Sequence, residues 1–423
     1  MCPMEAVRLE LEQQLADELY NLFQAEILQK IMRESKVEQG RGYIRSKLEG
    51  HCFKLTQRMA PRLHELCRSV QETLRFTEPV EFFILSDATL NCTAYPRIED
   101  QHEHLIMINS GLVERFTDDE LRFVIGHELG HLLSRNADLM RVIQFVFPPT
   151  ANVPLIFQNK VALWTNLAEL TADRFGYIAA PSLDSCLGTF FKSSSGLDTR
   201  RIDFDAHSYL QEMDSVLEYF RADGVSTLST HPINPIRVKA LQFFSESEMY
   251  RQIAAGQEPQ PDESLDKQIG ELIQALIDNS SSPLDEHRRY FISSGGLIMA
   301  GADRDLADEE LERIASILAG RTNFPLEFLR HVLNTDKVNE IFVQSARNIL
   351  AINPSERHAM FGYLIDVGLA DRLIQEREVE LLFRIGEQVF GFSRKEIAQV
   401  IAEAVQRGFI PRIRSRSAAP AED

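Results

Sequence analysis

Residues 117–133 read Thr117-Asp-Asp-Glu-Leu-Arg-Phe-Val-Ile-Gly-His-Glu-Leu-Gly-His-Leu-Leu133. Thr117 and Glu120 have the spacing of a capping box, in which each side chain accepts a hydrogen bond from the other residue's backbone amide. The acidic residues after Thr117 suit the positive end of a helix dipole. The stretch therefore predicts a helix on which His127 and His131, four residues apart, share one face.

Two imidazoles on one helix face can bind the same Zn²⁺ ion, and a glutamate directly after the first histidine can take a proton from a zinc-bound water. His127, Glu128 and His131 meet this pattern. We predict the two histidines as zinc ligands and Glu128 as a general base. The alternative is a surface helix that matches a short motif by chance.

A catalytic zinc site needs a third protein ligand and an open position. The segment Leu167-Ala-Glu-Leu-Thr-Ala-Asp-Arg174 places Glu169 and Asp173 on one face of a predicted helix. Glu169 is our candidate for the third ligand, and Asp173 can accept a hydrogen bond from the far ring nitrogen of His127. The alternative is a solvated acidic helix face, but apolar residues surround the pair in sequence: Leu163, Trp164, Leu167, Leu170 and Phe175.

A further histidine, His231, lies in the segment Leu228-Ser-Thr-His-Pro232, just before a predicted helix that begins at Asn234. It could stabilise the oxyanion of a hydrolysis intermediate, or close the metal site as a fourth ligand. The alternative is an ordinary turn at the start of a helix.

These motifs, in this order, resemble the HtpX-like and CAAX-prenyl-protease family of gluzincin zinc metallopeptidases. The family pattern has Asp-Glu-Leu ahead of the zinc motif, then Glu-x-x-x-Asp with Ala-Asp-Arg, and then Thr-His-Pro. The corresponding segments here are Asp119-Glu-Leu121, His127-Glu-Leu-Gly-His131, Glu169-Leu-Thr-Ala-Asp173-Arg174 and Thr230-His-Pro232. The resemblance covers about residues 70–245, and a segment around residues 90–95 matches only loosely.

The resemblance implies a role for each matched residue. His127, His131 and Glu169 would bind zinc, and Glu128 would act as the general base. Asp173 would support a ligand histidine, with Arg237 as a basic partner for its carboxylate, and His231 would be either a transition-state stabiliser or a latch.

Many relatives of this family span a membrane, but this chain has no apolar run of the roughly 20 residues that a span requires. The nearest candidate, residues 139–157, is interrupted by polar residues and prolines. We expect it to form a buried loop or short helices beside the site, as a lid or a peripheral membrane contact.

Composition narrows the class of protein further. The 423 residues carry a formal net charge of −18, which argues against nucleic acid as a partner. The five cysteines have no disulfide-like pattern, and the first thirty residues do not read as a signal peptide. We therefore expect a cytoplasmic protein.

The order of predicted elements indicates a mainly α fold with a small β-sheet. Residues 1–75 read as a helical segment packed on a zincin-like α+β peptidase domain at residues 76–255. Strands are predicted at residues 81–85, near 92–95 and at 104–109. Asn91, Cys92, Thr93 and Ala94 are our candidates for an edge strand that pairs with an extended substrate, with ordinary sheet packing as the alternative.

A polar, proline-containing stretch at residues 256–264 predicts a linker. Residues 265–411 then read as an all-α helical domain, and residues 412–423 as a disordered tail. Residues 295–310 and 391–396 resemble parts of TerB-like domains, which would make this half a site for recruiting protein partners.

Together these features predict a zinc-dependent metalloendopeptidase with one Zn²⁺ per chain, acting on peptides or unfolded proteins, with protein quality control as one setting. An aminopeptidase of the same general kind would need a Gly-x-Met-Glu-Asn-type strand, which the sequence lacks. The alternative from another class is a zinc-stabilised pseudo-peptidase or interaction scaffold without turnover.

Overall fold

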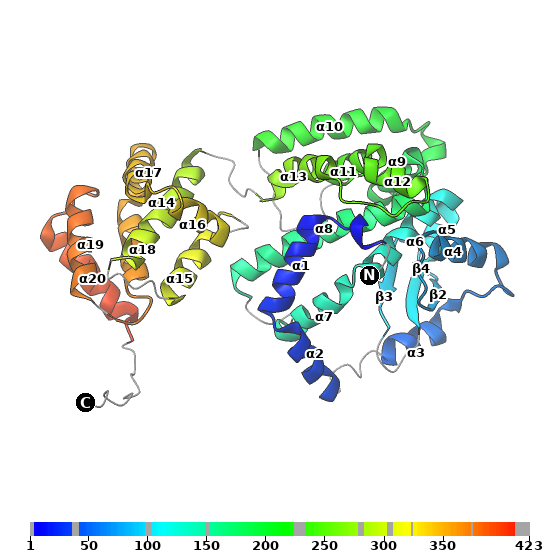
Figure 1. Ribbon diagram of the computed structural model, residues 1–423, viewed down its shortest axis with the longest axis horizontal. Coiled ribbons are helices and arrows are strands. Elements are labelled where there is room, and N and C mark those ends of the chain that lie inside the picture. The colour runs from blue at the N-terminus through cyan, green and yellow to red at the C-terminus, as the bar shows by residue number, and fades with distance from the viewer. Residues whose placement is uncertain are drawn as a thin grey trace. The chain divides into compact units, whose positions relative to one another are not determined.

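The computed structural model describes residues 4–35, 42–97, 103–148, 153–223, 234–277, 283–302, 308–322, 325–373 and 375–410. The fold is mostly helical with one small mixed sheet, followed by further helices (Figure 1), which confirms the predicted fold class. His231, the TerB-like segment around residue 305 and the predicted tail fall outside the described residues.

The chain divides into two compact units. Unit 1 comprises residues 1–153 and 160–276, and unit 2 comprises residues 154–159 and 277–423. The sheet and the residues of the metal motif all lie in unit 1.

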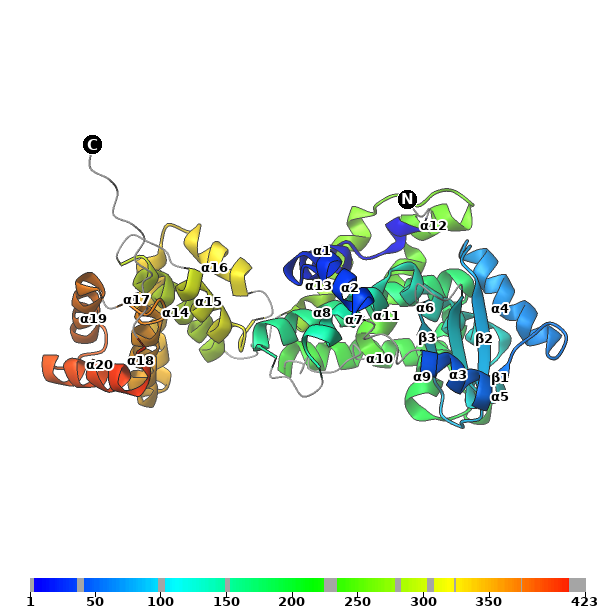
Figure 2. The same cartoon turned by 90° about the horizontal axis from the view of Figure 1, so that it is seen from below.

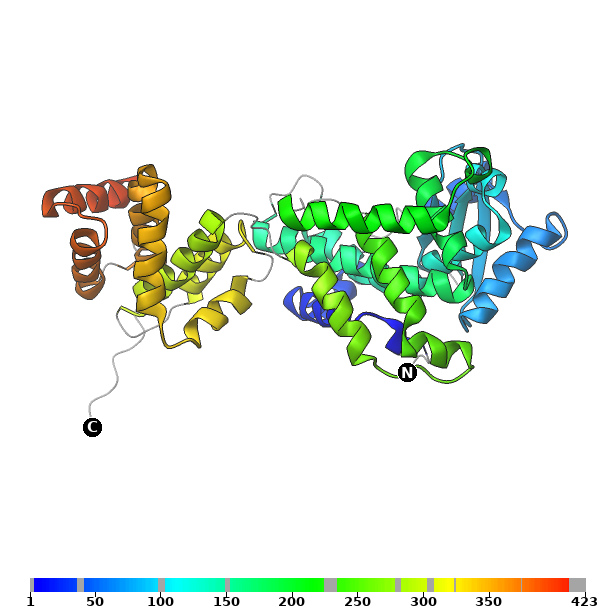
Figure 3. The same ribbon diagram turned by 90° about the horizontal axis from the view of Figure 1, so that it is seen from above.

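Along the chain, unit 1 begins with helices and one short strand, continues through the rest of the sheet and ends in a long helical region. Its elements are η1 (Glu5–Val7), α1 (Glu10–Leu22), α2 (Ala25–Glu34), α3 (Gly42–His51), β1 (Phe53–Lys54), α4 (Pro61–Thr73), β2 (Val80–Leu85), β3 (Cys92–Tyr95), β4 (His104–Asn109), α5 (Ser110–Arg115), α6 (Asp118–Leu133), α7 (Asn136–Val146), α8 (Leu155–Ala179), α9 (Leu183–Ser195), η3 (Thr199–Arg201), α10 (Ala206–Asp223), α11 (Asn234–Glu246), α12 (Glu248–Ala254) and α13 (Glu263–Ile277). The first residues of α8, up to Asn159, are grouped with unit 2. Helices α9, α10 and α11 contact one another (Figures 1 and 3).

The sheet has the strand order β1-β2-β4-β3. β2 and β4 are parallel, with Phe82 opposite Ile106, while β1 and β3 run antiparallel to their neighbours. Phe82 and Ile106 are buried on one face, and Phe83 packs with Leu105 on the other. The three longer strands were predicted, but the two-residue β1 was not, because a pair of residues is too short to show a strand's alternation.

The N-terminal segment is hydrogen-bonded to the face of α8 that lies opposite Glu169. The backbone amide of Leu9 donates to Thr171 Oγ1 at 3.2 Å, and Arg174 donates to the carbonyl of Val7 at 3.0 Å. The indole of Trp164 donates to the buried carboxylate of Glu12 at 3.2 Å. The face of α8 that does not carry Glu169 is therefore held by the first helices of the chain.

Unit 2 is built entirely from helices in its described part. These are α14 (Pro283–Ala300), α15 (Asp308–Leu318), α16 (Pro325–Leu333), α17 (Val338–Ile352), η4 (Pro354–Glu356), α18 (Arg357–Gly368), α19 (Glu376–Gln388) and α20 (Arg394–Gly408). Helix α14 contacts α15, α16, α17 and α18 (Figure 2), and Phe291, Ile314, Phe342 and Phe361 lie in the shared core.

The division between the units differs from the predicted linker at residues 256–264. Helix α13, placed by the sequence in the second domain, belongs to unit 1, and the division follows Leu276. Leu265 and Ile269 of α13 are buried. The linker segment itself is anchored, since the Asp262 carboxylate accepts from the amides of Glu248 and Met249. A polar composition does not reveal such capping bonds, so nothing in the sequence indicated that this segment is anchored.

None of the described helices combines the length and apolar character needed to cross a lipid bilayer. The apolar stretch at residues 139–157 contributes instead to two separate helices, α7 and the start of α8.

Candidate metal centre

Helix α6 begins with the predicted capping box. Thr117 Oγ1 accepts from the Glu120 amide at 3.3 Å, and the Glu120 carboxylate accepts from the Thr117 amide at 2.7 Å. This bonding satisfies two amides that a helix start would otherwise leave without partners.

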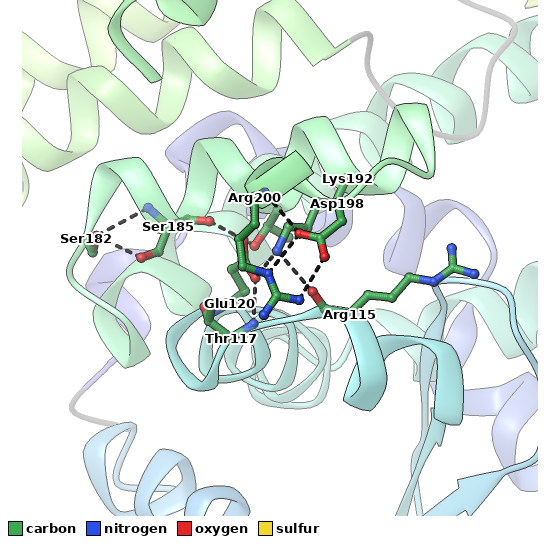
Figure 4. A network of polar contacts seen from close by, with 9 residues as sticks. Arg115, Thr117, Glu120, Ser182, Ser185, Lys192, Asp198 and Arg200 are labelled. Atoms are coloured by element: carbon green, nitrogen blue, oxygen red, sulfur yellow. Dashed lines mark hydrogen bonds and ion pairs between the residues drawn. The ribbon is translucent and has the colours of Figure 1, made fainter. Parts of the chain in front are cut away.

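The same glutamate also forms a buried ion pair with α9. Lys192 Nζ lies 2.7 Å from Glu120 Oε2 and donates to the Arg115 carbonyl at 3.0 Å (Figure 4). The Lys192 side chain is only 1% exposed and that of Glu120 only 5%. The start of α6 is therefore fixed both along its own chain and against the neighbouring helix.

Glycines let α6 approach α8 closely. A Cβ atom on Gly126 would lie 2.6 Å from Ala179 Cβ, and one on Gly130 would lie 2.9 Å from the side chain of Phe175. On the facing helix, a Cβ on Gly176 would lie 2.8 Å from the Phe123 ring. Any side chain at these positions would push the helices apart, so the glycines set the separation between His127 and Glu169.

Potential ligand atoms of three residues converge across this contact. His127 Nε2 and His131 Nε2 are 3.1 Å apart, and they lie 3.5 and 3.3 Å from the two carboxylate oxygens of Glu169. Ligand atoms of a tetrahedral zinc site lie about 3.3–3.4 Å from one another, because each is about 2.0–2.1 Å from the ion. The three residues therefore fit a small tetrahedral cation and could hold a metal ion.

Asp173 orients the ring of His127, and Arg237 in turn orients Asp173. His127 Nδ1 lies 3.0 Å from Asp173 Oδ1, and an ionised carboxylate can only accept, so Nδ1 carries the proton and Nε2 is left with its lone pair. Arg237 donates to both oxygens of Asp173, at 2.8 and 2.6 Å, and its guanidinium lies 4.9 Å from the centre of the Phe190 ring.

This arrangement keeps Asp173 ionised although it is buried. Burial alone would raise the pKa of Asp173, but the charge and hydrogen bonds of Arg237 outweigh it and hold that pKa below its ordinary value. The Asp173 carboxylate in turn raises the pKa of Arg237 against the effect of burial.

Glu128 projects from α6 toward the edge strand of the sheet. Its Oε2 atom accepts a hydrogen bond from the backbone amide of Ala94, in β3, at 2.8 Å. Burial raises the pKa of Glu128 above its ordinary value, although the nearby charges of His127 and His131 act in the opposite direction. A carboxyl with a raised pKa is suited to exchange protons near neutral pH.

A cleft of about 520 Å³ contains these groups. One wall comes from residues 90–94, which precede and form the edge strand, and another from α7 and α8, including Met140 and Ala168. The cleft therefore brings the metal group, Glu128, Arg237 and the four predicted edge-strand residues Asn91, Cys92, Thr93 and Ala94 to one site.

Some residues that shape the site were not identified from the sequence. Gly126, Gly130 and Gly176 determine the helix separation, and Phe190 supports Arg237. The spacing of four between Gly126 and Gly130 was a usable signal, because small residues four apart form a flat helix face. Nothing in the sequence indicated Phe190 or Lys192.

The family model of peptidase family M48 matches residues 57–244. Those residues are a peptidase family M48 domain. M48 peptidases are metal-dependent enzymes that hydrolyse peptide bonds, and the metal is typically zinc. The M48 domain here carries its histidine and glutamate group within the matched range.

The chain is also similar to the chloroplastic Plastoglobule-localized metallopeptidase 48 of Arabidopsis thaliana, with 23% identity over 205 residues. That match covers 45% of this chain and 59% of the relative, so the chain spans less than two thirds of the relative's length. No solved structure gave a significant match. The family match and this similarity both support the M48 domain.

Proposed function

We propose that this protein is a zinc-dependent endopeptidase that cleaves extended segments of unfolded proteins and binds one Zn²⁺ per chain. The observation that carries the proposal is the set of separations between His127, His131 and Glu169, which match those of tetrahedral ligands. Bound zinc would lower the pKa of its water to about 7 and polarise the scissile carbonyl.

The side chains around the metal group have distinct roles in this proposal. Glu128 takes the proton of the attacking water and later passes it to the leaving amine. Asp173 fixes the tautomer of His127, and Arg237 keeps Asp173 charged. His231, which lies outside the described residues, is proposed as an oxyanion stabiliser or as a latch on the metal.

The lining of the cleft supports unfolded protein segments as substrates. Apart from the metal group, Glu128 and Arg237, the described residues that line it carry no charged side chain. A charged substrate side chain would lose its hydration there without gaining a partner. Apolar side chains, which folded proteins bury and unfolded proteins expose, incur no such cost.

Cleavage of unfolded casein by the zinc-loaded protein tests the proposal. We expect a chelator to abolish cleavage, and Glu128→Gln to reduce turnover by about 10²- to 10⁴-fold while zinc binding is retained. Glu114→Gln, on the exposed face of α5, is the matched control and should cleave like the wild type.

Wild-type cleavage by Glu128→Gln would refute the proposed mechanism. Zinc binding without any cleavage by the wild type would instead favour a metal-stabilised scaffold.

A further inference from the structure

The edge strand β3 turns half of its backbone groups away from the sheet. The Asn109 amide donates to the Asn91 carbonyl at 3.0 Å, so residues 91 and 109 form a hydrogen-bonded pair of the antiparallel ladder. The register then makes Cys92, opposite Ile108, and Ala94, opposite Ile106, the non-hydrogen-bonded positions. The amides and carbonyls of Cys92 and Ala94 therefore face outward, toward the cleft.

One of these outward groups is already used within the protein. The Ala94 amide donates to Glu128 Oε2 at 2.8 Å, and β3 lies at the end of the sheet beside α6 (Figure 1). No other hydrogen bond to the Glu128 carboxylate occurs in the described part of the chain. A hydrogen bond to an ionised carboxylate is among the stronger ones in proteins, and here it fixes the orientation of a side chain with three rotatable bonds.

We propose that the Ala94 amide is a positioning group for Glu128, an inference that rests on the proposed function. It holds one carboxylate oxygen, so that the other is directed to the proton of the attacking water. The same bond removes the Ala94 amide from substrate binding. An extended peptide can then pair with β3 only through the two carbonyls and the Cys92 amide.

This arrangement couples substrate binding to the orientation of the base. A peptide amide that donates to the Ala94 carbonyl lies beside the residue that holds Glu128, so the register of the bound peptide is set relative to the catalytic carboxylate. An edge strand with every outward amide free would accept a peptide in more than one register.

Hydrogen exchange tests the bond directly, in metal-free protein and without any activity. We expect the Ala94 amide to exchange about tenfold faster or more in Glu128→Ala than in the wild type, because the variant removes a charge-assisted hydrogen bond. The Cys92 amide, which also faces outward but does not contact Glu128, should exchange equally in both proteins. An unchanged Ala94 rate in the variant would overturn the inference.

Kinetics tests the consequence. Ala94→Pro removes the amide and puts a ring carbon in the place of its hydrogen, so the Glu128 carboxylate, 2.8 Å from that nitrogen, loses its donor and must move. We expect kcat to fall about 10- to 100-fold with KM and zinc affinity unchanged, as for the loss of a single preorganised donor. Glu114→Gln, which does not line the cleft, is the control and should keep both constants, while Cys92→Pro should raise KM more than it lowers kcat.

The outcomes separate this inference from the proposed function. If Ala94→Pro turns over like the wild type, the positioning role is wrong even though the enzyme is a peptidase. If the wild type cleaves nothing, the proposed function fails and this inference fails with it. If Ala94→Pro does not fold, hydrogen exchange in Glu128→Ala decides the question alone.

Discussion

Glycines allow close helix packing in both units. They lie between α6 and α8 in unit 1, and between α14 and its neighbours in unit 2. In unit 1, a Cβ on Gly126 would lie 2.6 Å from Ala179 Cβ. In unit 2, a Cβ on Gly296 would lie 2.5 Å from the Tyr363 hydroxyl and 2.6 Å from Ile314. The packing device is the same in both units, but what it brings together differs.

The contact in unit 1 gathers ionisable groups, whereas the contact in unit 2 encloses a core that is mainly apolar. Beside Gly126 the close approach joins His127 to Glu169 and Asp173. Around Gly296 it packs Phe291 against Phe342 and directs the Tyr363 hydroxyl to a backbone carbonyl. Close packing alone therefore stabilises a fold, and it forms a site only where polar residues flank the small ones.

The largest stability effect that would sharpen this comparison concerns the buried charges of unit 1. Lys192→Met leaves the Glu120 carboxylate buried without its cation, at a site where both side chains are almost fully excluded from water. We expect unit 1 to lose about 3–5 kcal/mol of unfolding free energy, measured by chemical denaturation.

Lys54→Met is the matched control, because Lys54 also pairs with a glutamate, Glu81, but is 43% exposed. We expect a loss below about 1 kcal/mol. Equal losses of unfolding free energy in the two variants would mean that burial does not strengthen the contribution of the Glu120 pair.

The glycines provide a direct test of the comparison. Gly126→Ala and Gly296→Ala should each cost about 1–3 kcal/mol, as overpacking of a core does. Only Gly126→Ala should also weaken zinc binding, because it moves α6 relative to the helix that carries Glu169. Thermal unfolding and zinc titration of both variants would measure this, and equal zinc affinities would separate the helix contact from the metal group.

The smallest expected effect concerns a partly exposed ion pair in unit 2. The hydrogen bond with Arg288, more than any other contact, lowers the pKa of Glu356. A lowered carboxyl pKa gives stability that is present above the ordinary glutamate value, near 4.5, and is lost as pH falls through the folded value.

Glu356→Gln should therefore cost less than about 1 kcal/mol at neutral pH and nothing at pH values where Glu356 is protonated. Denaturation of the variant and of the wild type across this pH range would measure the difference. The exposed Glu340→Gln serves as the control. A loss in Glu356→Gln that persists unchanged in acid would point to packing instead of charge.

The sequence was informative where a structural feature follows from the spacing of residues within one helix or strand. The capping box at Thr117, the shared face of His127 and His131, and the strands at residues 81–85 and 104–109 all depend on neighbours within a few residues. It was uninformative about the ion pair of Glu120 with Lys192, since those partners are 72 residues apart and neither residue carries a local signal. It also did not reveal how residues 256–264 are held, because the bonds that anchor Asp262 come from a neighbouring helix.

The sequence by itself determined which atoms could bind a metal, because imidazole and carboxylate groups four residues apart must share a helix face. Only the tertiary structure decided that α6 and α8 approach closely enough for those atoms to meet, through glycines whose missing side chains matter only when another helix is present. It alone also turned the Ala94 amide toward Glu128, because the direction of a strand's amides depends on its register with the neighbouring strand.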